Sequence, residues 1–134
     1  MSASRTRLVV DSSAIIACCL GETGFEALEL ALTRCPQVLM SAPTRLELGM
    51  VSQQRGVRAK VEKAIETYTI DIIAFDADMA HLAITAFDKF GKGRHPAALN
   101  FGDCCSYALA KALDLPLLFK GNDFSQTDIA LAVI

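Results

Sequence analysis

The sequence predicts an α/β fold with a mostly parallel central sheet flanked by helices. Short, continuously apolar runs occur at residues 8–10, 38–40 and 117–119, and longer segments with helical spacing of apolar residues separate them. Strands that alternate with helices favour a parallel sheet, whose strands are buried on both faces and therefore continuously apolar. With 134 residues, of which 52% are hydrophobic, the chain is expected to form a single domain over residues 1–134.

The first strand, residues 8–10, ends at Asp11 and passes at once into a helix over residues 14–20. Ser12 or Ser13 is expected to cap this helix by accepting from its free N–H groups. Asp11 has two interpretations. It is either a helix cap itself or a functional carboxylate just beyond a strand's carboxyl end, where open α/β sheets place their ligands.

The next elements follow from spacing and from start and stop residues. A second helix begins at Thr23, and the strand at 38–40 follows it. Ser41 and Pro43 then give the capping and first-turn signature of a third helix, which reaches about Arg55. The remaining predicted elements are a charged helix over 57–67, a β-rich run over 68–75, a helix from Asp76 to about Phe90, an irregular loop over 91–100, a helix from its cap Asn100 to Leu113, a strand over 116–119 and a last strand over 129–133.

Composition limits the compartment and the classes of partner. No stretch approaches the roughly 20 apolar residues that a membrane span needs, and Asp11 interrupts the first apolar run, unlike a signal peptide's core. The five cysteines are odd in number and include two vicinal pairs, which argues against a disulfide framework. We therefore expect a soluble, cytoplasmic protein without a membrane partner. The formal net charge of −2 gives no basic footprint for nucleic acid.

One acid lies inside the third predicted helix. Glu47 shares a helical stripe with Pro43, Met50 and Val51, so its side chain is expected to face the core. A buried carboxylate is costly unless a cation, hydrogen-bond donors or a raised pKa accompanies it. A salt bridge with Arg45 or a neighbouring basic side chain is one interpretation, and a functional carboxylate is the other.

Two further acids stand at the ends of predicted elements. Asp103 occupies about the third position of the helix capped by Asn100. It either complements the helix dipole or acts as a metal ligand, with Gly102 allowing close approach of backbone or substrate. Asp123 follows the strand at 117–119, where it is either a turn aspartate or a fourth functional acid.

Parallel strands bring these acids together. Their carboxyl ends, and the helix starts that follow, lie on one edge of the sheet, so Asp11, Asp103 and Asp123 can converge, with Glu47 nearby. Two such charges about 4 Å apart would repel by roughly 4 kcal/mol at an effective dielectric near 20. The cluster therefore predicts bound cations. Hard oxygen ligands select Mg²⁺ or Mn²⁺, which activate water and stabilise charge on a phosphodiester.

In this arrangement the chain resembles the PIN-domain ribonucleases, and specifically the VapC-type toxins of toxin–antitoxin pairs. The resemblance covers essentially the whole chain and rests on residues 9–14, 45–47, 91–96, 99–104, 118–124 and 127–128. The four acids of the family match Asp11, Glu47, Asp103 and Asp123 in order. Asn122 is a departure, since relatives often carry a second acid there.

The resemblance implies a metal-dependent endoribonuclease that hydrolyses RNA with water and without a covalent intermediate. Asp11 and Asp103 would coordinate the principal Mg²⁺, or Mn²⁺ in its place. Glu47 and Asp123 would complete the outer coordination, orient the water or hold a second ion. Ser13 matches the hydroxyl residue that accompanies the first aspartate.

Supporting and RNA-binding residues follow from the same resemblance. Asn100 would support Asp103. Without the four acidic charges the formal net charge of −2 becomes +2, so Lys92, Arg94 and Lys120 are candidate phosphate contacts. A solvated charged surface is the alternative for each of them. Tyr107 is expected to make a core or dimer contact, with stacking on a base as the alternative.

The family also implies two protein partners. One is a second copy of the chain in a homodimer, and the other is a small antitoxin whose C-terminal segment occludes the acidic pocket. Exposed apolar residues on the first helices, including Leu28 and Leu32, are candidates for the antitoxin contact. A core stripe has the same pattern, so both interpretations stay open.

Two other functions compete with a toxin nuclease. A receiver-like signalling domain also gathers acids at strand ends and places a lysine after a late strand, but it carries an acidic pair after its first strand, where this chain has serines. A PIN-like module that binds or processes RNA without acting as a toxin is the closer alternative. The presence of all four acids favours catalysis.

Overall fold

The computed structural model describes residues 6–134 and confirms the predicted α/β class. Four parallel strands form one sheet in the order β3-β2-β1-β4. These strands are β1 (Arg7–Val10), β2 (Gln37–Ser41), β3 (Asp71–Ile73) and β4 (Leu117–Leu118). That one domain extends over residues 1–134 stays a prediction, and residues 1–5 lie outside the described part of the chain.

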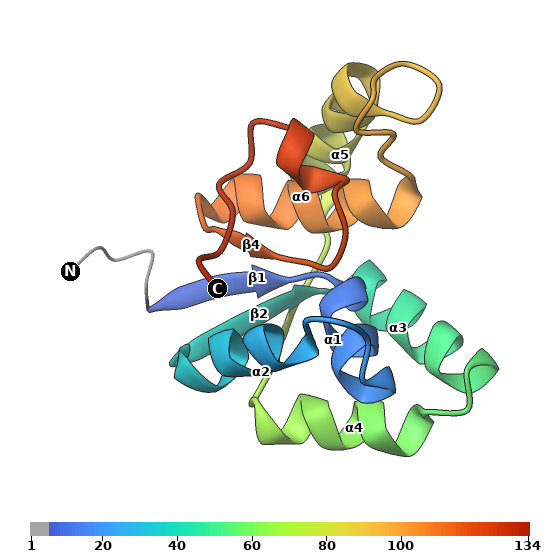
Figure 1. Cartoon of the computed structure of the whole chain (residues 1–134). Coiled ribbons are helices and arrows are strands. Elements are labelled where there is room, and N and C mark those ends of the chain that lie inside the picture. Colours follow the sequence, from blue (N-terminus) through green and yellow to red (C-terminus); the bar gives the residue numbers. More distant parts are fainter. Residues whose placement is uncertain (1–5) are drawn as a thin grey trace.

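Helices cover both faces of the sheet. They are α1 (Ser12–Leu20), α2 (Phe25–Arg34), α3 (Ala42–Gln54), α4 (Arg58–Thr67), α5 (Ala77–Phe90) and α6 (Phe101–Leu113), followed by a short 3-10 turn, η2 (Phe124–Gln126). In Figure 1, α1, α2 and α4 lie on one side of the strands, and α5 and α6 lie on the other. None of the described helices has both the length and the hydrophobicity that crossing a membrane demands.

The alternation of side chains along β1 divides the core into two layers. Leu8 and Val10 pack with the apolar faces of α1, α2 and α4, whereas Val9 packs with α6. Val9 and Val10 are fully buried, as expected for a parallel strand covered on both sides. The centre of the sheet is thereby covered on both faces, and the carboxyl end of β1 leads to the candidate site.

Two strand predictions need correction. The last strand expected over 129–133 is wrong, because only an isolated bridge joins Leu131 to Leu117. Ile129 is buried in the core, but Leu131 is 45% exposed and Val133 is 92% exposed, so the end of this segment leaves the sheet. The β-rich run over 68–75 contributes only the three residues of β3.

The capping prediction at α3 was right in position but wrong in the atoms used, whereas the serine expected to cap α1 is not its cap. Ser41 is the N-cap residue of α3, and Pro43 lies in its first turn, but the Ser41 side chain makes no capping bond. Its buried hydroxyl has no hydrogen-bond partner among the described residues. At α1 the cap is Asp11 and not a serine, because the helix already begins at Ser12.

Candidate active site

Asp11 lies at the carboxyl end of β1, between β2 and β4. Its backbone N–H donates to the Leu118 carbonyl at 2.9 Å, which aligns the ends of β1 and β4. Its Oδ2 accepts the Ser13 backbone N–H at 3.1 Å, and its Oδ1 accepts the Ser106 hydroxyl at 2.5 Å. Asp11 is only 4% exposed. It caps α1 as one interpretation expected, and the bonds to both oxygens also fix its carboxylate at the sheet edge.

Glu47 reaches the same edge from the second turn of α3. Its Oε1 accepts the Ser12 hydroxyl at 2.8 Å, directly beside Asp11. Its carboxylate also packs against Gly102, where an added Cβ would lie 2.3 Å from Oε2. Gly102 therefore provides the close approach that the sequence suggested, and the group that approaches is the carboxylate of Glu47.

The alternative partner of Glu47 is excluded. Arg45 pairs with Glu62 of α4 at 2.5 Å, so the expected salt bridge between Arg45 and Glu47 is wrong. The stripe assigned to Glu47 also needs correction, because Met50 is 57% exposed. The buried face of α3 is instead formed by Thr44, Leu48 and Ser52. Glu47 lies half-buried at the border of this face, where a hydroxyl donor, rather than a cation, stabilises it.

Asp103 is held by a reciprocal cap at the start of α6. Its backbone N–H donates to Asn100 Oδ1 at 2.9 Å, and its Oδ2 accepts the Asn100 backbone N–H at 3.1 Å. This capping box fixes the carboxyl group as a helix-terminal acid, as one interpretation proposed. Asn100 thus supports Asp103 structurally, as the sequence predicted.

The charge of Asp103 is nevertheless poorly stabilised. Burial, together with the charges of Asp11 and Asp123 and a side-chain hydrogen bond to Asp123, raises its pKa to about 7 against the opposing backbone bond from Asn100. Acids that perturb one another in this way lie close together. The structure thus brings Asp11, Asp103 and Asp123 from three separate elements to one place.

Asp123 completes the group from the segment after β4. It occupies the N-cap position of η2 and is exposed, yet its side chain makes no capping hydrogen bond. A turn aspartate would use its carboxylate locally. The side chain of Asp123 instead interacts with Asp103, twenty residues earlier in the chain.

No cationic side chain in the described part of the chain forms an ion pair with these acids. The ion pairs of the described residues join Arg45 to Glu62 and Lys111 to Asp128, and neither includes one of the four acids. The Lys120 ammonium follows β4 but donates to the Thr23 carbonyl. Negative charge therefore accumulates at this edge, which favours binding of a positive ligand.

The donor set has the chemistry of a magnesium or manganese site. It consists of carboxylate oxygens, and hard divalent cations prefer such ligands. Among residues 6–134, no three His, Cys, Asp or Glu side chains are already grouped in a manner that could hold a metal ion. Mg²⁺ does not need such a cage, because one or two carboxylates and several waters commonly bind it. The pair Asp11 and Asp103 fits that requirement.

Two predicted supporting groups occupy different places around the acids. Ser13 donates to the Asp11 carboxylate through its backbone N–H, whereas its hydroxyl accepts the Lys120 backbone N–H at 3.0 Å and ties α1 to the end of β4. Arg94 lies over the ring of Phe87 at 5.8 Å, and Lys92 is exposed in the same loop. Contact of Lys92, Arg94 or Lys120 with RNA stays a prediction.

Three aromatic and apolar side chains are core residues. Tyr107 is buried, and its hydroxyl donates to Asp128 at 2.5 Å, so it is part of the core as expected. Leu28 and Leu32 are 2% and 1% exposed. The prediction that these two leucines are available to an antitoxin is therefore wrong, since they form the core stripe of α2.

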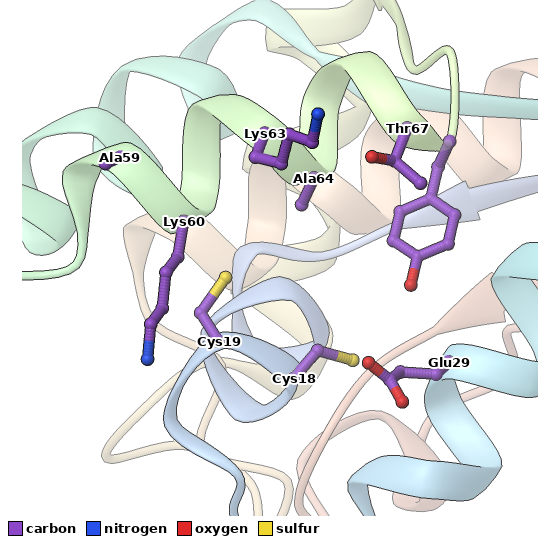
Figure 2. Close-up of a pocket in the computed structure, with 9 residues that line it drawn as sticks. Cys18, Cys19, Glu29, Ala59, Lys60, Lys63, Ala64 and Thr67 are labelled. Carbon is purple, nitrogen blue, oxygen red and sulfur yellow. The ribbon is translucent and has the colours of Figure 1, made fainter.

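A separate pocket of about 530 Å³ lies between α1, α2 and α4 (Figure 2), and none of the four acids lines it. Its lining residues are Cys18, Cys19, Glu29, Ala59, Lys60, Lys63, Ala64, Thr67 and Tyr68. Burial, followed by the charge of Glu29, raises the pKa of the Cys18 thiol to about 12. A thiol held neutral in this way is a poor nucleophile and a poor metal ligand.

Sequence reasoning missed three hydroxyl groups of the site, those of Ser12, Thr44 and Ser106. Ser106 follows Asp103 by three residues and Thr44 precedes Glu47 by three, which places each on the same helix face as an acid. That spacing was a usable signal. It did not show which acid each hydroxyl reaches, because the bond from Ser106 to Asp11 joins α6 to β1.

A parallel α/β sheet whose strand ends carry a group of carboxylates places the chain among the α/β proteins that have an acidic site at the carboxyl edge of the sheet. Among these, this chain belongs to the PIN-domain family, whose sequence profile matches residues 8–130. Ribonuclease VapC42 of Mycobacterium tuberculosis is 44% identical over 126 residues, which span 91% of this chain and 96% of that protein. Ribonuclease VapC of Mycolicibacterium smegmatis is 42% identical over 92% of this chain and 98% of its own length.

Solved structures share the fold at lower sequence identity. The crystal structure of Mycobacterium tuberculosis VapC20, described as a sarcin-ricin loop cleaving toxin, has a TM-score of 0.73 at 16% identity and covers 92% of this chain and 96% of its own. A toxin–antitoxin complex from Klebsiella pneumoniae has a TM-score of 0.67 at 20% identity, with coverage of 90% and 92%. These likenesses show that the PIN-type architecture is retained.

Proposed function

We propose that the chain is a metal-dependent endoribonuclease that acts as the toxin of a type II toxin–antitoxin system. The observation that carries the proposal is the convergence of Asp11, Asp103 and Asp123 without a paired cation among the described residues, where burial and the neighbouring acids together raise the pKa of Asp103 to about 7. Proteins build such clusters chiefly where function requires them. Relatives of 42% and 44% identity that are named VapC ribonucleases support the same assignment.

Asp11 and Asp103 would hold the principal Mg²⁺, or Mn²⁺ in its place. When bound, such an ion lowers the pKa of water and stabilises negative charge on a phosphodiester. Asp11 is prepared for this role, because donors fix both of its carboxylate oxygens. The capping box of Asn100 holds Asp103 in the same manner.

Glu47 and Asp123 would orient the attacking water, complete the outer coordination or hold a second ion. The Ser12 hydroxyl fixes one oxygen of Glu47, and the contact with Gly102 fixes the direction from which the carboxylate enters the site. Asp123 is exposed, so it can reach a bound phosphodiester from the solvent side. Lys92, Arg94 and Lys120 would contact phosphates of the RNA and position the strand.

A VapB-type antitoxin is the proposed protein inhibitor. A toxin–antitoxin complex shares the fold, which supports a partner of this kind. The acid edge is negative, so an inhibitor would neutralise it with a cationic side chain. The antitoxin would thereby compete with the metal or the RNA phosphate for the same place.

A homodimer is the second proposed assembly. Ile84 and Phe87 of α5 and Phe101 of α6 are 59%, 38% and 79% exposed and border an apolar hollow of about 370 Å³. An exposed apolar surface of this kind favours burial against another protein. Ile84→Lys should convert a dimeric wild type into a monomer, as light scattering during gel filtration would measure. A wild type that is monomeric at all concentrations would contradict the dimer.

Cleavage of total RNA tests the proposed activity. The purified chain, freed of antitoxin, is incubated with a mixed RNA pool and Mg²⁺ or Mn²⁺, beside EDTA and an Asp11→Asn variant. We expect discrete cuts that require the metal and disappear in the variant, and mapping of the ends would identify the target. Binding of RNA by folded, metal-loaded protein without any cutting would instead establish a binding module.

A further inference from the structure

Two buried hydroxyl groups lie behind the acid site and have no role in the proposed chemistry. Thr44 of α3 and Ser106 of α6 are both 0% exposed, and their oxygens lie 3.2 Å apart. The Ser106 oxygen is also 2.5 Å from Asp11 Oδ1. A buried polar network of this kind links α3, α6 and the end of β1 in one line.

The direction of the protons in this line follows from chemistry. An ionised carboxylate only accepts hydrogen bonds, whereas a serine hydroxyl has a single proton to donate. Ser106 therefore donates a hydrogen bond to Asp11 and must accept a hydrogen bond from its other neighbour. Thr44 is consequently the donor to Ser106, and the order is fixed as Thr44 to Ser106 to Asp11.

We propose that Ser106 and Thr44 are positioning residues, which hold the carboxylate of Asp11 in the orientation that binds the divalent cation. The inference rests on the proposed function. Asp11 Oδ2 is anchored by the Ser13 N–H, and Oδ1 is anchored by Ser106. Each oxygen retains a further lone pair, so the two anchors orient the carboxylate and still leave it able to coordinate a metal.

A purely structural role would have a different signature. If the network only joined α3 to α6, its loss would lower thermal stability and leave metal affinity per folded molecule unchanged. Ser52 provides a matched control, because it is also a buried serine of α3 but donates to the Gly49 carbonyl, away from Asp11. Ser52→Ala removes a buried hydroxyl without touching the line to Asp11.

The test is the dissociation constant of Mn²⁺ for RNA-free protein, measured by calorimetry and electron paramagnetic resonance. Ser106→Ala should weaken Mn²⁺ binding by about 10-fold or more, the usual effect of losing an orienting partner of a ligand. Thr44→Val keeps the shape of threonine but lacks its hydroxyl, and it should weaken binding several-fold, roughly the effect of one lost neutral hydrogen bond. Thr44→Ser keeps the hydroxyl and should bind as the wild type does. Ser52→Ala should melt earlier with unchanged affinity.

The outcomes distinguish failure of the positioning role from failure of the proposed nuclease activity. Wild-type affinity in Ser106→Ala, beside a wild type that binds Mn²⁺ and cuts RNA, would overturn the positioning role and leave the nuclease intact. If Ser106→Ala does not fold, equal affinities of Thr44→Val and Thr44→Ser overturn the positioning role instead. A wild type that neither binds Mn²⁺ nor cuts RNA overturns both proposals.

Discussion

Helix α1 borders two regions with opposite chemistry. At its N-terminal end, Asp11 and Ser12 belong to the acid site, where hydroxyl and N–H groups hold carboxylates in fixed orientations. At its C-terminal end, Cys18 and Cys19 line the pocket of about 530 Å³ with the side chain of Glu29 directed toward Cys18 (Figure 2). The pocket is a cavity lined by neutral thiols and scattered charges, whereas the acid site holds several carboxylates in fixed orientations.

The two regions differ in whether a raised pKa destabilises the form of the group that is present at neutral pH. Burial raises the pKa of both Asp103 and Cys18, to about 7 and about 12. For the thiol this shift costs nothing at pH 7, because the neutral form is already the stable one. For the carboxyl, burial first and the neighbouring acids second disfavour the charged form, which a bound cation would stabilise. Space alone is therefore a weaker sign of chemistry than charges brought together at a cost.

The largest effect is expected at Asp103. Asp103→Asn should reduce metal-dependent RNA cleavage by about 1,000-fold or more, several kcal/mol of lost transition-state stabilisation. It should also raise the melting temperature of the metal-free protein, because it removes a charge that Asp11 and Asp123 repel. Asp114→Asn, at the exposed far end of the same helix, is the control and should leave RNA cleavage unchanged. Retained cleavage in Asp103→Asn would show that RNA cleavage does not depend on the acid site.

A second substitution disturbs the acid site without removing an acid. Gly102→Ala places a Cβ 2.3 Å from Glu47 Oε2, so the carboxylate must move. Cleavage should fall by about 10- to 100-fold, since small displacements of catalytic groups have effects of this order. Gly49→Ala in α3 meets only Arg45 at 3.6 Å and should retain full activity. Initial rates at saturating metal measure both variants, and equal rates would mean that Glu47 tolerates displacement.

A third substitution tests the thiol pocket. The charge of Glu29 raises the pKa of Cys18, so Glu29→Gln should lower it, although burial keeps it above the usual value of 9.0. At a fixed pH near 9 the thiolate fraction, and the rate of alkylation with it, should rise about two- to tenfold. The matched control is Glu26→Gln, an exposed acid one turn earlier in α2. RNA cleavage should be unchanged, and a change would show that the two regions are coupled.

The smallest effect concerns a carboxylate that already has its partners. Tyr107 and Lys111 lower the pKa of Asp128 from 3.8, so this acid stabilises the fold above about pH 4 and loses that contribution as the pH falls through its lowered pKa. Tyr107→Phe should cost about 0.5–1 kcal/mol at pH 7 and less at pH 3. Urea unfolding at the two pH values measures this. An equal cost at both would exclude the tyrosine as the cause of the shift.

Sequence reasoning was accurate for most of the structure that a local pattern decides, although the apolar run over 129–133 forms no strand. The apolar runs located the strands of the sheet, and Asn100 was correctly identified as the cap of α6. Reasoning failed where a residue chooses between a partner nearby in the sequence and one on another helix. Arg45 selected Glu62 of α4 over Glu47, and the stripe of Leu28 and Leu32 turned inward. Both choices depend on how helices pack, which a helical period does not encode.

The sequence by itself determined the α/β class, the parallel sheet and the gathering of acids at its carboxyl edge, because strand polarity alone places those ends together. Only the tertiary structure decided how the acids are held. Ser106 reaches Asp11 across 95 residues, and Ser12 reaches Glu47 across 35. Gly102 admits Glu47 because α3 and α6 approach closely there. Such contacts require particular side-chain orientations between elements that are distant along the chain, and hydrophobic periodicity carries no information about them.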